Sequence, residues 1–295
     1  MTAPELTVVI VSHQTRADLR RCLRSIFGST QDVRYEVWVV DNASTDGSAE
    51  MVERDFPRVR LVRSEENLGF ARANNLVLRQ ARSEFVLLLN PDTIVHDRAF
   101  DEPIAFLRRT PEAGMVTCRL VKADGTLDLA CRRSFPNAFD GFSRAVGLAQ
   151  AFPRSRLFAR YNVTYLDENE TYEVDAVNGA YMMVRRNAME QVGLLDEDYF
   201  MYMEDLDWCH RFREHGWRIF YHPTTTVVHL KGQSGKQSSG PMIHAFFDSM
   251  ELFCRKRYAV EQPAWILSAT CLGNRTWKQA TLLRNALRKE KRVTP

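Results

Sequence analysis

The sequence predicts an α/β fold in which helices flank a mostly parallel sheet. Short apolar runs alternate with stretches of helical periodicity from Leu6 to Leu89. Successive β-α units of this kind form a parallel sheet with helices on both faces. The chain has 295 residues, 45% of them hydrophobic and 26% charged, a composition that is typical of globular proteins and argues against disorder.

Neither a membrane span nor an export signal is predicted. The longest apolar runs, such as Phe85 to Leu89, are far shorter than the roughly 20 residues of a membrane-spanning helix. No basic residue precedes the first apolar run in MTAPELTVVIVSH, which favours a first strand over a signal peptide. We therefore expect a cytoplasmic protein.

The first half of the chain repeats one pattern. Continuous apolar runs predict buried strands, and apolar residues at helical spacing after a run predict a crossover helix. Leu19, Cys22 and Ile26 show this spacing after the first strand. The predicted strands are Leu6 to Val11, Tyr35 to Val40, Val59 to Val62 and Phe85 to Leu89, with helices after the first two and from Phe70 to Ala81.

The pattern changes after Asn90, and residues 131–172 are irregular and rich in aromatic residues and arginine. We expect a domain over 1–240, with a nucleotide-binding half at 1–95 and an acceptor-side half at 96–240, and a C-terminal helical extension over 241–295. The elements predicted here are helices at Arg98 to Arg109, Glu204 to His215, 241–260 and 275–291, strands at Met115 to Val121, Val174 to Val184, Arg218 to Tyr221 and Thr225 to Leu230, and a loop from Lys231 to Gly240.

Cysteine and charge distribution exclude some classes of protein. Six cysteines are scattered without a CxxC pair, which predicts reduced, mostly buried thiols and no zinc or disulfide framework. The net charge is +3, but ten Lys or Arg stand against three Glu from Glu251 onward, a local balance of +7. A solvated helix face is the common explanation of such a tail, and contact with an anionic lipid surface is the alternative that we keep. We expect no nucleic-acid partner.

Four polar clusters follow the four predicted strands of the first half. Ligands of open parallel sheets bind at the carboxyl ends of the strands. Each cluster alone is typical of a helix cap or an Asx turn, but four in succession favour a ligand site. The absence of GxGxxG and GxxxxGK[ST] argues against a dinucleotide fold and a P-loop. The clusters are Ser12-His13, Asp41-Asn42-Ala43-Ser44, Asn67-Leu68-Gly69-Phe70 and Asn90-Pro91-Asp92.

Two sets of carboxylates are candidates for chemistry. Asp92, directly after a strand, is placed to ligate a hard divalent cation that bridges a diphosphate. Glu204 and Asp205 follow an apolar stretch over 199–203, which suggests a partly buried cleft where a carboxylate serves as general base. The alternative for this segment is a well-capped surface helix with an Asp207 to Arg211 pair.

Six motifs in order make the chain resemble the family 2 inverting glycosyltransferases of the GT-A fold. Within that family it is most similar to bacterial rhamnosyltransferases of cell-wall or surface polysaccharide synthesis. The likeness spans residues 7 to about 232. Its motifs are VVIVSHQTRADLRRCLRSI, VWVVDNASTDGS, NLGFARANN, FVLLLNPDT, VNGAYMMVRR and FMYMEDLDWCHRFREHGW.

The resemblance implies roles for single residues. Ser12 and Asp41 would flank the nucleoside, with the Asp41 carboxylate accepting the imide N–H of uracil or thymine. Asp92 corresponds to the last acid of the family's DxD metal motif. His229 stands where some relatives supply a metal ligand, with a structural histidine as the alternative. The further implied residues are Asn42, Asn67, Gly69 and Asn90 on the nucleotide side, Asn90 replacing the first acid of the DxD, and Asn178 and Gly179 on the acceptor or donor-sugar side.

The resemblance also implies the reaction. A sugar, best matched by L-rhamnose from dTDP-rhamnose, would move with inversion to a hydroxyl of a glycan or lipid-linked glycan. Asp205 or Glu204 would be the base, and Mg²⁺ or Mn²⁺ would be bound by Asp92. Alternatives are another UDP- or dTDP-sugar donor, such as a hexose or galactofuranose, a sugar-phosphate nucleotidyltransferase, whose glycine-rich first loop is missing here, and a non-catalytic sugar-nucleotide-binding protein.

The last predicted helix has two candidate roles. Leu283 and Leu287 are four residues apart, and Trp277 lies near the same helical face, among basic residues from Thr276 to Lys291, as in a basic amphipathic helix. Peripheral contact with the inner face of the membrane is one expectation. Packing on the catalytic domain or in a homodimer is the other.

Overall fold

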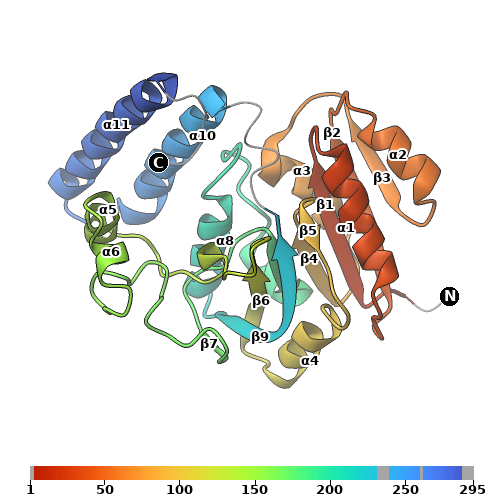
Figure 1. The fold of residues 1–295 in the computed structure, drawn as a ribbon. Coiled ribbons are helices and arrows are strands. Elements are labelled where there is room, and N and C mark those ends of the chain that lie inside the picture. The colour runs from red at the N-terminus through yellow and green to blue at the C-terminus, as the bar shows by residue number, and fades with distance from the viewer. Residues whose placement is uncertain (1–2, 231–238, 260–261, 288–295) are drawn as a thin grey trace.

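A computed structural model of the chain describes residues 3–230, 239–259 and 262–287 (Figure 1). It has a central sheet with helices on both faces, as the sequence predicts. The strands are β1 (Leu6–Ser12), β2 (Tyr35–Asn42), β3 (Arg60–Ser64), β4 (Phe85–Leu89), β5 (Thr93–Ile94), β6 (Ala113–Val121), β7 (Tyr172–Glu173), β8 (Tyr181–Arg185) and β9 (Arg218–His229). The helices are α1 (Arg16–Gly28), α2 (Ser48–Asp55), α3 (Gly69–Leu78), α4 (Asp101–Arg109), α5 (Ala138–Ala145), α6 (Leu148–Ala151), α7 (Arg186–Val192), α8 (Glu204–Glu214), α10 (Ser239–Phe253) and α11 (Ala264–Leu287), with a 3₁₀ turn at Leu129–Cys131 and a π-helix at Cys254–Tyr258.

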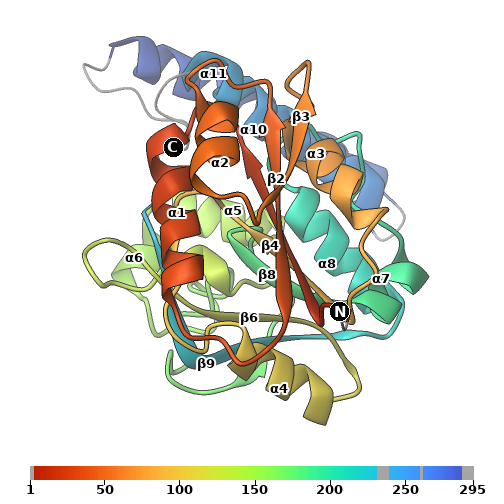
Figure 2. The ribbon, with the colours of Figure 1, turned by 90° about the vertical axis from the view of Figure 1, so that its right-hand side faces the viewer.

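The sheet is parallel where the sequence repeats its β-α pattern. Its order is β3-β2-β1-β4-β8-β6-β9-β5, with β7 paired to β9. The strands β3, β2, β1 and β4 run parallel, whereas β8 is antiparallel to both β4 and β6. Figure 2 shows α1 and α2 on one face of the parallel part and α3 on the other. Because β8 runs against β4, the loop that precedes β8 lies at the carboxyl end of β4.

Several elements differ from the prediction. The strand-like stretch over 174–184 is a loop around Asn178 followed by β8. The two short strands after residue 217 are one strand, β9, whose register against β6 shifts between Thr117 and Arg119. Residues 131–172 contain α5 and α6, and α7 and β5 were not predicted. Helix α11 begins at Ala264, well before the predicted start at 275. The loop residues 231–238 and the predicted helix end at 288–291 lie outside the described residues.

The C-terminal helices pack on the rest of the fold. The Tyr258 hydroxyl donates to the Pro136 carbonyl at 2.6 Å, and the Ser249 hydroxyl donates to the Met201 carbonyl at 2.9 Å. Trp277 packs edge-on against Phe247, with ring centroids 6.0 Å apart. This contact lies within the C-terminal extension, between α10 and α11, so it does not place Trp277 on the catalytic domain. Within the described residues, no helix combines the length and apolar character that a bilayer span requires.

The cysteines are free and mostly buried in the core, as the sequence predicts. Strand β4 is buried along its whole length, and β8 is buried from Tyr181 to Val184. All six cysteines are free thiols, and all except the half-buried Cys254 are buried. Burial raises the pKa of Cys22 and Cys209 to about 12, so these thiols are unreactive and serve as packing groups.

Candidate active site

The ends of β1 and β2 form the first part of the site. Ser12 and Asp41 are register partners in the parallel ladder, so their side chains occupy neighbouring strand ends. Both are buried, and the Ser12 hydroxyl shares a hydrogen bond with the Thr15 hydroxyl at 2.8 Å. The loops that follow contain Gln14 and Ala43 at φ 56° and 60°, a conformation that non-glycine residues adopt at a cost and that is concentrated at functional sites.

Asp41 has a free acceptor atom. Its Oδ2 accepts the Ser44 backbone N–H at 3.2 Å. Its Oδ1 is buried and has no hydrogen-bond partner among the described residues. A buried acceptor without a donor is unfavourable, because the desolvation of that atom is not compensated. A ligand N–H that reached Oδ1 would supply the missing bond.

Asn42 forms hydrogen bonds to the third polar cluster, Asn67-Leu68-Gly69-Phe70. Its amide nitrogen donates to the Asn67 side-chain oxygen at 2.9 Å and to the Gly69 carbonyl at 3.1 Å. Its amide oxygen accepts the Leu68 N–H at 2.8 Å. Because both amide protons and the oxygen are engaged, Asn42 shapes the loop at Asn67 to Gly69 and has no free donor for a ligand.

Two glycines bring three loops together. Gly69 has φ +75°, and a Cβ there would lie 2.2 Å from the Phe200 carbonyl oxygen. The Phe70 N–H donates to that same oxygen at 2.8 Å. A Cβ on Gly179 would lie 2.7 Å from the Phe70 ring. The loop at 67–70 therefore touches both the loop before β8 and the segment that leads into α8.

The fourth polar cluster, Asn90-Pro91-Asp92, lies beside β9. The Asn90 N–H donates to the Ala180 carbonyl at 3.1 Å, which ties the end of β4 to the loop of Asn178 and Gly179. Asn178 is buried, and its side-chain oxygen has no hydrogen-bond partner among the described residues. Thr93 pairs with His229 in the β5 and β9 ladder, so Asp92 comes beside the end of β9.

Asp92 and His229 form a compact acid and imidazole pair. Nε2 of His229 lies 3.3 Å from Asp92 Oδ1, and its Nδ1 lies 2.9 Å from Asp128 Oδ2. Burial acts against the charged imidazole, but the hydrogen bonds to Asp128 and Asp92 outweigh it and raise the pKa of His229 to about 9. All three side chains are buried.

These residues fit a divalent cation if other oxygens complete its shell. A carboxylate that holds one ring nitrogen is the usual support for a histidine that ligates a metal through the other. Asp128 has that position, and Asp92 supplies an oxygen ligand. No group of three or more His, Cys, Asp or Glu in the described part of the chain could hold a metal by itself, so phosphate or water oxygens must contribute.

Helix α8 begins in strained backbone next to a cation. Tyr202 and Met203 have φ 70° and 67° directly before Glu204. Asp205 Oδ2 lies 2.6 Å from Nη2 of Arg133, which also donates to the Val177 carbonyl at 2.6 Å. Burial disfavours the charged guanidinium, but Asp205 outweighs it, so the pKa of Arg133 is raised. Arg133 thus links Asp205 to the loop that carries Asn178.

Glu204 lies in a different environment from its neighbour. It is buried, and its Oε2 has no hydrogen-bond partner among the described residues. Burial, followed by the adjacent Asp205 carboxylate, raises the pKa of Glu204 to about 8. Glu204 is therefore mostly protonated near neutral pH.

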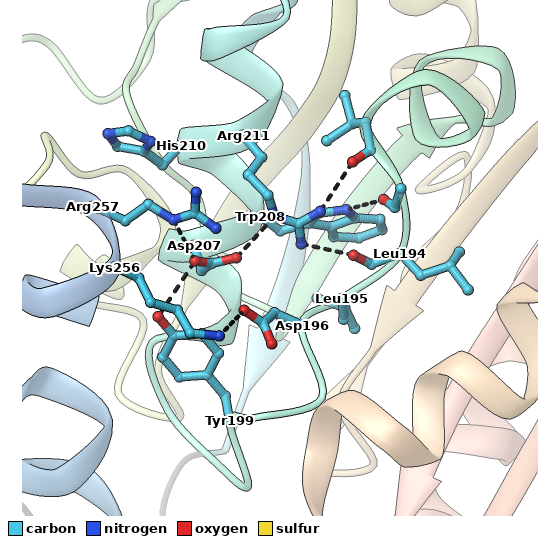
Figure 3. A network of polar contacts seen from close by, with 12 residues as sticks. Leu194, Leu195, Asp196, Tyr199, Asp207, Trp208, His210, Arg211, Lys256 and Arg257 are labelled. Carbon is cyan, nitrogen blue, oxygen red and sulfur yellow. Dashed lines mark hydrogen bonds and ion pairs between the residues drawn. The ribbon is translucent and has the colours of Figure 1, made fainter. Parts of the chain in front are cut away.

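Helix α8 is buried from Leu206 to His210 and at Phe212, contrary to the surface-helix alternative. Asp207 is buried, and it pairs with Arg211 at 2.9 Å and with Arg257 of the π-helix at 2.6 Å (Figure 3). The Tyr199 hydroxyl donates to Asp207 at 3.3 Å. Lys256 pairs with Asp196 at 2.6 Å in the same network. The expected Asp207 to Arg211 pair exists, but it is an interior contact that joins α8 to the C-terminal extension.

Arg133 and Asp128 were missed by sequence reasoning. Arg133 comes from the segment predicted to be irregular, and Asp128 from a stretch with no predicted element. Their partners lie 72 and 101 residues away. The only local sign was the tandem Arg132-Arg133 in an aromatic stretch. Spacing along the chain cannot pair groups at such separations.

Comparison with known proteins gives the same picture as the motifs. Residues 4–242 match the profile of the family described as "Glycosyltransferase like family 2". An N-acetylglucosaminyl-diphospho-decaprenol L-rhamnosyltransferase of Mycobacterium tuberculosis is 29% identical over 97% of this chain and 95% of its own. Rhamnosyltransferase WbbL of Escherichia coli is 25% identical over 75% of this chain and 82% of its own.

The fold is shared with solved structures. A mannosyltransferase of Pyrobaculum calidifontis, solved with GDP-mannose and Mn²⁺, superposes with a TM-score of 0.57. The alignment covers 98% of this chain and 82% of that one at 20% identity. This likeness concerns the fold, whose sheet and flanking helices match the expected GT-A arrangement.

Proposed function

Because the chain belongs to glycosyltransferase family 2, and is thus a glycosyltransferase, we propose that it transfers L-rhamnose from dTDP-rhamnose to a glycan hydroxyl with inversion. The names of the two rhamnosyltransferase relatives support this donor. The name of the mycobacterial relative supports a lipid-linked acceptor sugar. The observation that carries the proposal is the direct contact of the nucleotide-side loop with the segment before α8, through Phe70 and Phe200.

The nucleoside end of the donor is assigned to the ends of β1 and β2. The free Oδ1 of Asp41 accepts the imide N–H of thymine or uracil, which satisfies its missing hydrogen bond. Asn67 and Gly69 line the ribose or diphosphate on the loop that Asn42 fixes. Asn90, directly after β4, lies on the nucleotide side as well. Asn178 and Gly179, in the loop before β8, lie on the acceptor or donor-sugar side.

The diphosphate is assigned to the edge between β5 and β9. Asp92 and His229 would hold Mg²⁺ or Mn²⁺, with Asp128 orienting the imidazole. When bound, the cation supplies charge that stabilises the departing diphosphate. The Mn²⁺ named with the P. calidifontis mannosyltransferase supports this assignment.

Asp205 is assigned as the general base. The acceptor oxygen attacks the anomeric carbon, the bond from that carbon to the phosphate oxygen breaks, and the acceptor proton passes to Asp205. Glu204 is less suited, because a carboxyl group with a pKa of about 8 already carries a proton near neutral pH. Arg133 holds Asp205 at the end of α8.

One experiment tests the donor and the reaction together. The protein is incubated with dTDP-rhamnose, UDP-glucose, UDP-galactofuranose and GDP-mannose, each with Mn²⁺, and the released nucleoside diphosphate is measured. We expect slow release from dTDP-rhamnose alone, and faster release when a lipid-linked N-acetylglucosamine acceptor is added. Preferential release from another donor would contradict the rhamnose assignment. Binding of donors, seen as a thermal shift, without release from any of them would contradict catalysis.

A further inference from the structure

The segment from α5 to α6 carries its polar residues inside and its apolar residues outside. In α5, Asp140 and Ser143 are buried, whereas Phe139 and Phe142 are 40% and 56% exposed. Val146, directly after the helix, is 54% exposed. Phe139, Phe142 and Val146 follow an i, i+3, i+7 spacing, so they lie along one face of the helix. This arrangement is the reverse of an ordinary surface helix.

Exposed apolar side chains are concentrated in this segment. Ten large hydrophobic side chains are exposed among the described residues, and five of them lie between residues 139 and 157. Phe158 joins the two ends of the segment, because its ring lies 6.1 Å from Phe139 and 5.6 Å from Phe152. A contiguous apolar patch of this kind marks a binding surface more often than a solvent-facing one. The five residues are Phe139, Phe142, Val146, Phe152 and Leu157.

The charge around the patch has one sign. Arg144, Arg154 and Arg156 are exposed, and none has a carboxylate partner among the described residues. The only acidic residue from 137 to 166 is Asp140, which is buried and paired with Arg160 at 2.6 Å. Arg144 and Arg156 lie over the rings of Tyr161 and Tyr165, contacts that leave their positive charge uncompensated by an acid. Apolar side chains beside such arginines are typical of a surface that binds an anionic lipid headgroup region.

We propose that residues 138–158 dock on the surface of an anionic bilayer. Phe142, Phe152 and Leu157 enter the interface, and the three arginines contact lipid phosphates. The attachment is peripheral and reversible, because each basic residue near an anionic surface strengthens binding only about fivefold and salt screens that effect. This proposal does not depend on the donor or on the base.

The docking segment is tied directly to the candidate active site. The Ser134 N–H donates to the Tyr161 carbonyl at 2.9 Å, and Arg160 donates to the Phe135 carbonyl at 2.6 Å. These bonds join the two ends of the segment to each other. They lie next to Arg133 in the sequence, and Arg133 is the partner of Asp205. Attachment through this segment therefore holds Asp205 near the membrane surface, where a lipid-linked acceptor would present its sugar.

Helix α11 is the competing surface, but two of the three cations among its described residues are already paired. Its exposed apolar residues are Trp265, Leu272 and Leu283. Two of its cations are already paired within the protein, Arg275 with Glu251 and Lys278 with Asp248, both at 2.7 Å. We therefore place the main lipid contact on α5 and α6 and use α11 as the control surface.

The test compares matched variants of the full chain by co-sedimentation with vesicles. The vesicles are phosphatidylcholine alone and phosphatidylcholine mixed with phosphatidylglycerol. The apolar variant is Phe142→Ser/Phe152→Ser/Leu157→Ser, and its control is Trp265→Ser/Leu272→Ser/Leu283→Ser. The charge variant is Arg154→Gln/Arg156→Gln, and its control is Arg24→Gln/Arg82→Gln, two exposed arginines of the nucleotide-binding half. Circular dichroism and thermal melting confirm that each variant is folded.

We expect the wild-type chain and both controls to bind the phosphatidylglycerol vesicles, more weakly at high salt. The apolar variant should lose binding, and the charge variant should lose about 30-fold in partition coefficient, from about fivefold for each arginine. Equal binding of the apolar variant and the wild type would overturn the proposal, as would equal losses in the α11 control. A dimer in vesicle-free solution that the apolar variant converts to monomer would also overturn it, because the patch would then be a subunit interface.

Discussion

Two adjacent carboxyl groups at the start of α8 differ in burial and in their hydrogen-bond partners. Asp205 pairs with Arg133 at 2.6 Å, whereas Glu204 has a buried oxygen without a partner among the described residues. Asp205→Asn should lower kcat by about 10²- to 10⁴-fold, the usual contribution of a general base, and should leave dTDP affinity nearly unchanged. Glu204→Gln, its matched control, should lose less than about tenfold. The opposite ranking of the two variants in a transfer assay would assign the base to Glu204.

The pKa of Glu204 also predicts how stability depends on pH. Its ordinary value is 4.5, and the fold raises it to about 8. Between these values the folded state binds more protons than the unfolded state, so this group's contribution to stability is complete below about pH 4.5 and is lost as the pH rises through 8. Glu204→Gln should remove that loss. The melting temperature of the variant minus that of the wild type should increase from about pH 5 to about pH 9. A difference that does not change with pH would contradict the burial of a protonated Glu204.

Asp92 should act on the phosphates and not on the base of the nucleotide. Its Oδ1 lies 3.3 Å from Nε2 of His229. By our assignment, Asp92 ligates the cation. Asp92→Ala should therefore weaken dTDP binding in the presence of Mn²⁺ and leave thymidine binding unchanged. Calorimetry with both ligands, with and without Mn²⁺, measures the difference. If wild type and variant bind dTDP equally, with no effect of Mn²⁺ on either, the cation has no part in the mechanism.

At the scale of elements, Gly69 is required by the meeting of two loops. Its positive φ alone would cost an alanine about 1 to 2 kcal/mol, and its Cβ would also collide with the Phe200 carbonyl oxygen at 2.2 Å. Gly125 is the matched control, because it has φ +80° and a Cβ added there would meet no atom of the described residues within 4 Å. We expect Gly125→Ala to lower the free energy of unfolding by about 1 kcal/mol and Gly69→Ala by clearly more. Donor affinity should fall in Gly69→Ala alone; equal effects of the two variants would show that the contact with Phe200 is not needed.

The sequence predicts elements well where local pattern and tertiary environment agree. The strands β1 and β4 are buried on both faces, and their continuous apolar runs reveal them, whereas β3 is a half-exposed edge strand. Helix α5 could not be read in this way, because it buries Asp140 and exposes Phe142, the reverse of the pattern that periodicity detects. For a similar reason, two short strands were predicted where the structure has the single strand β9. Pro223 and three threonines interrupt its apolar run, while the shifted register against β6 keeps it one strand.

At the scale of the whole molecule, the site was predictable as a set of strand ends but not as a network. Ser12, Asp41 and Asp92 follow apolar strands, and parallel strands bring such residues to one edge. The groups that support them come from distant segments: Asp128 for His229 and Arg133 for Asp205. The C-terminal extension is part of this network too, since Arg257 reaches Asp207 within α8. Only the assembled fold reveals these partners.

The last prediction concerns that link between the extension and α8. Asp207 is fully buried and is held by Arg211 and Arg257, at 2.9 Å and 2.6 Å. Removing one partner of a buried ion pair leaves charge poorly compensated, so Arg257→Gln should lower the free energy of unfolding by about 3 kcal/mol. Lys256→Gln is the control from the same π-helix. Lys256 pairs with the part-exposed Asp196 and the largely exposed Asp198. Because these charges stay in contact with solvent, the expected cost is below about 1 kcal/mol.

Urea unfolding of these two variants, and of Asp207→Asn with and without Arg257→Gln, measures the coupling. Because the pair shares one interaction, the double variant should lose less than the two single losses combined. Additive losses would mean that the extension stabilises α8 by apolar packing instead. The same conclusion would follow if Arg257→Gln lost no more free energy of unfolding than Lys256→Gln. Coupled losses would make the extension a structural part of the glycosyltransferase domain, since it would then fix the helix whose first turn carries Asp205.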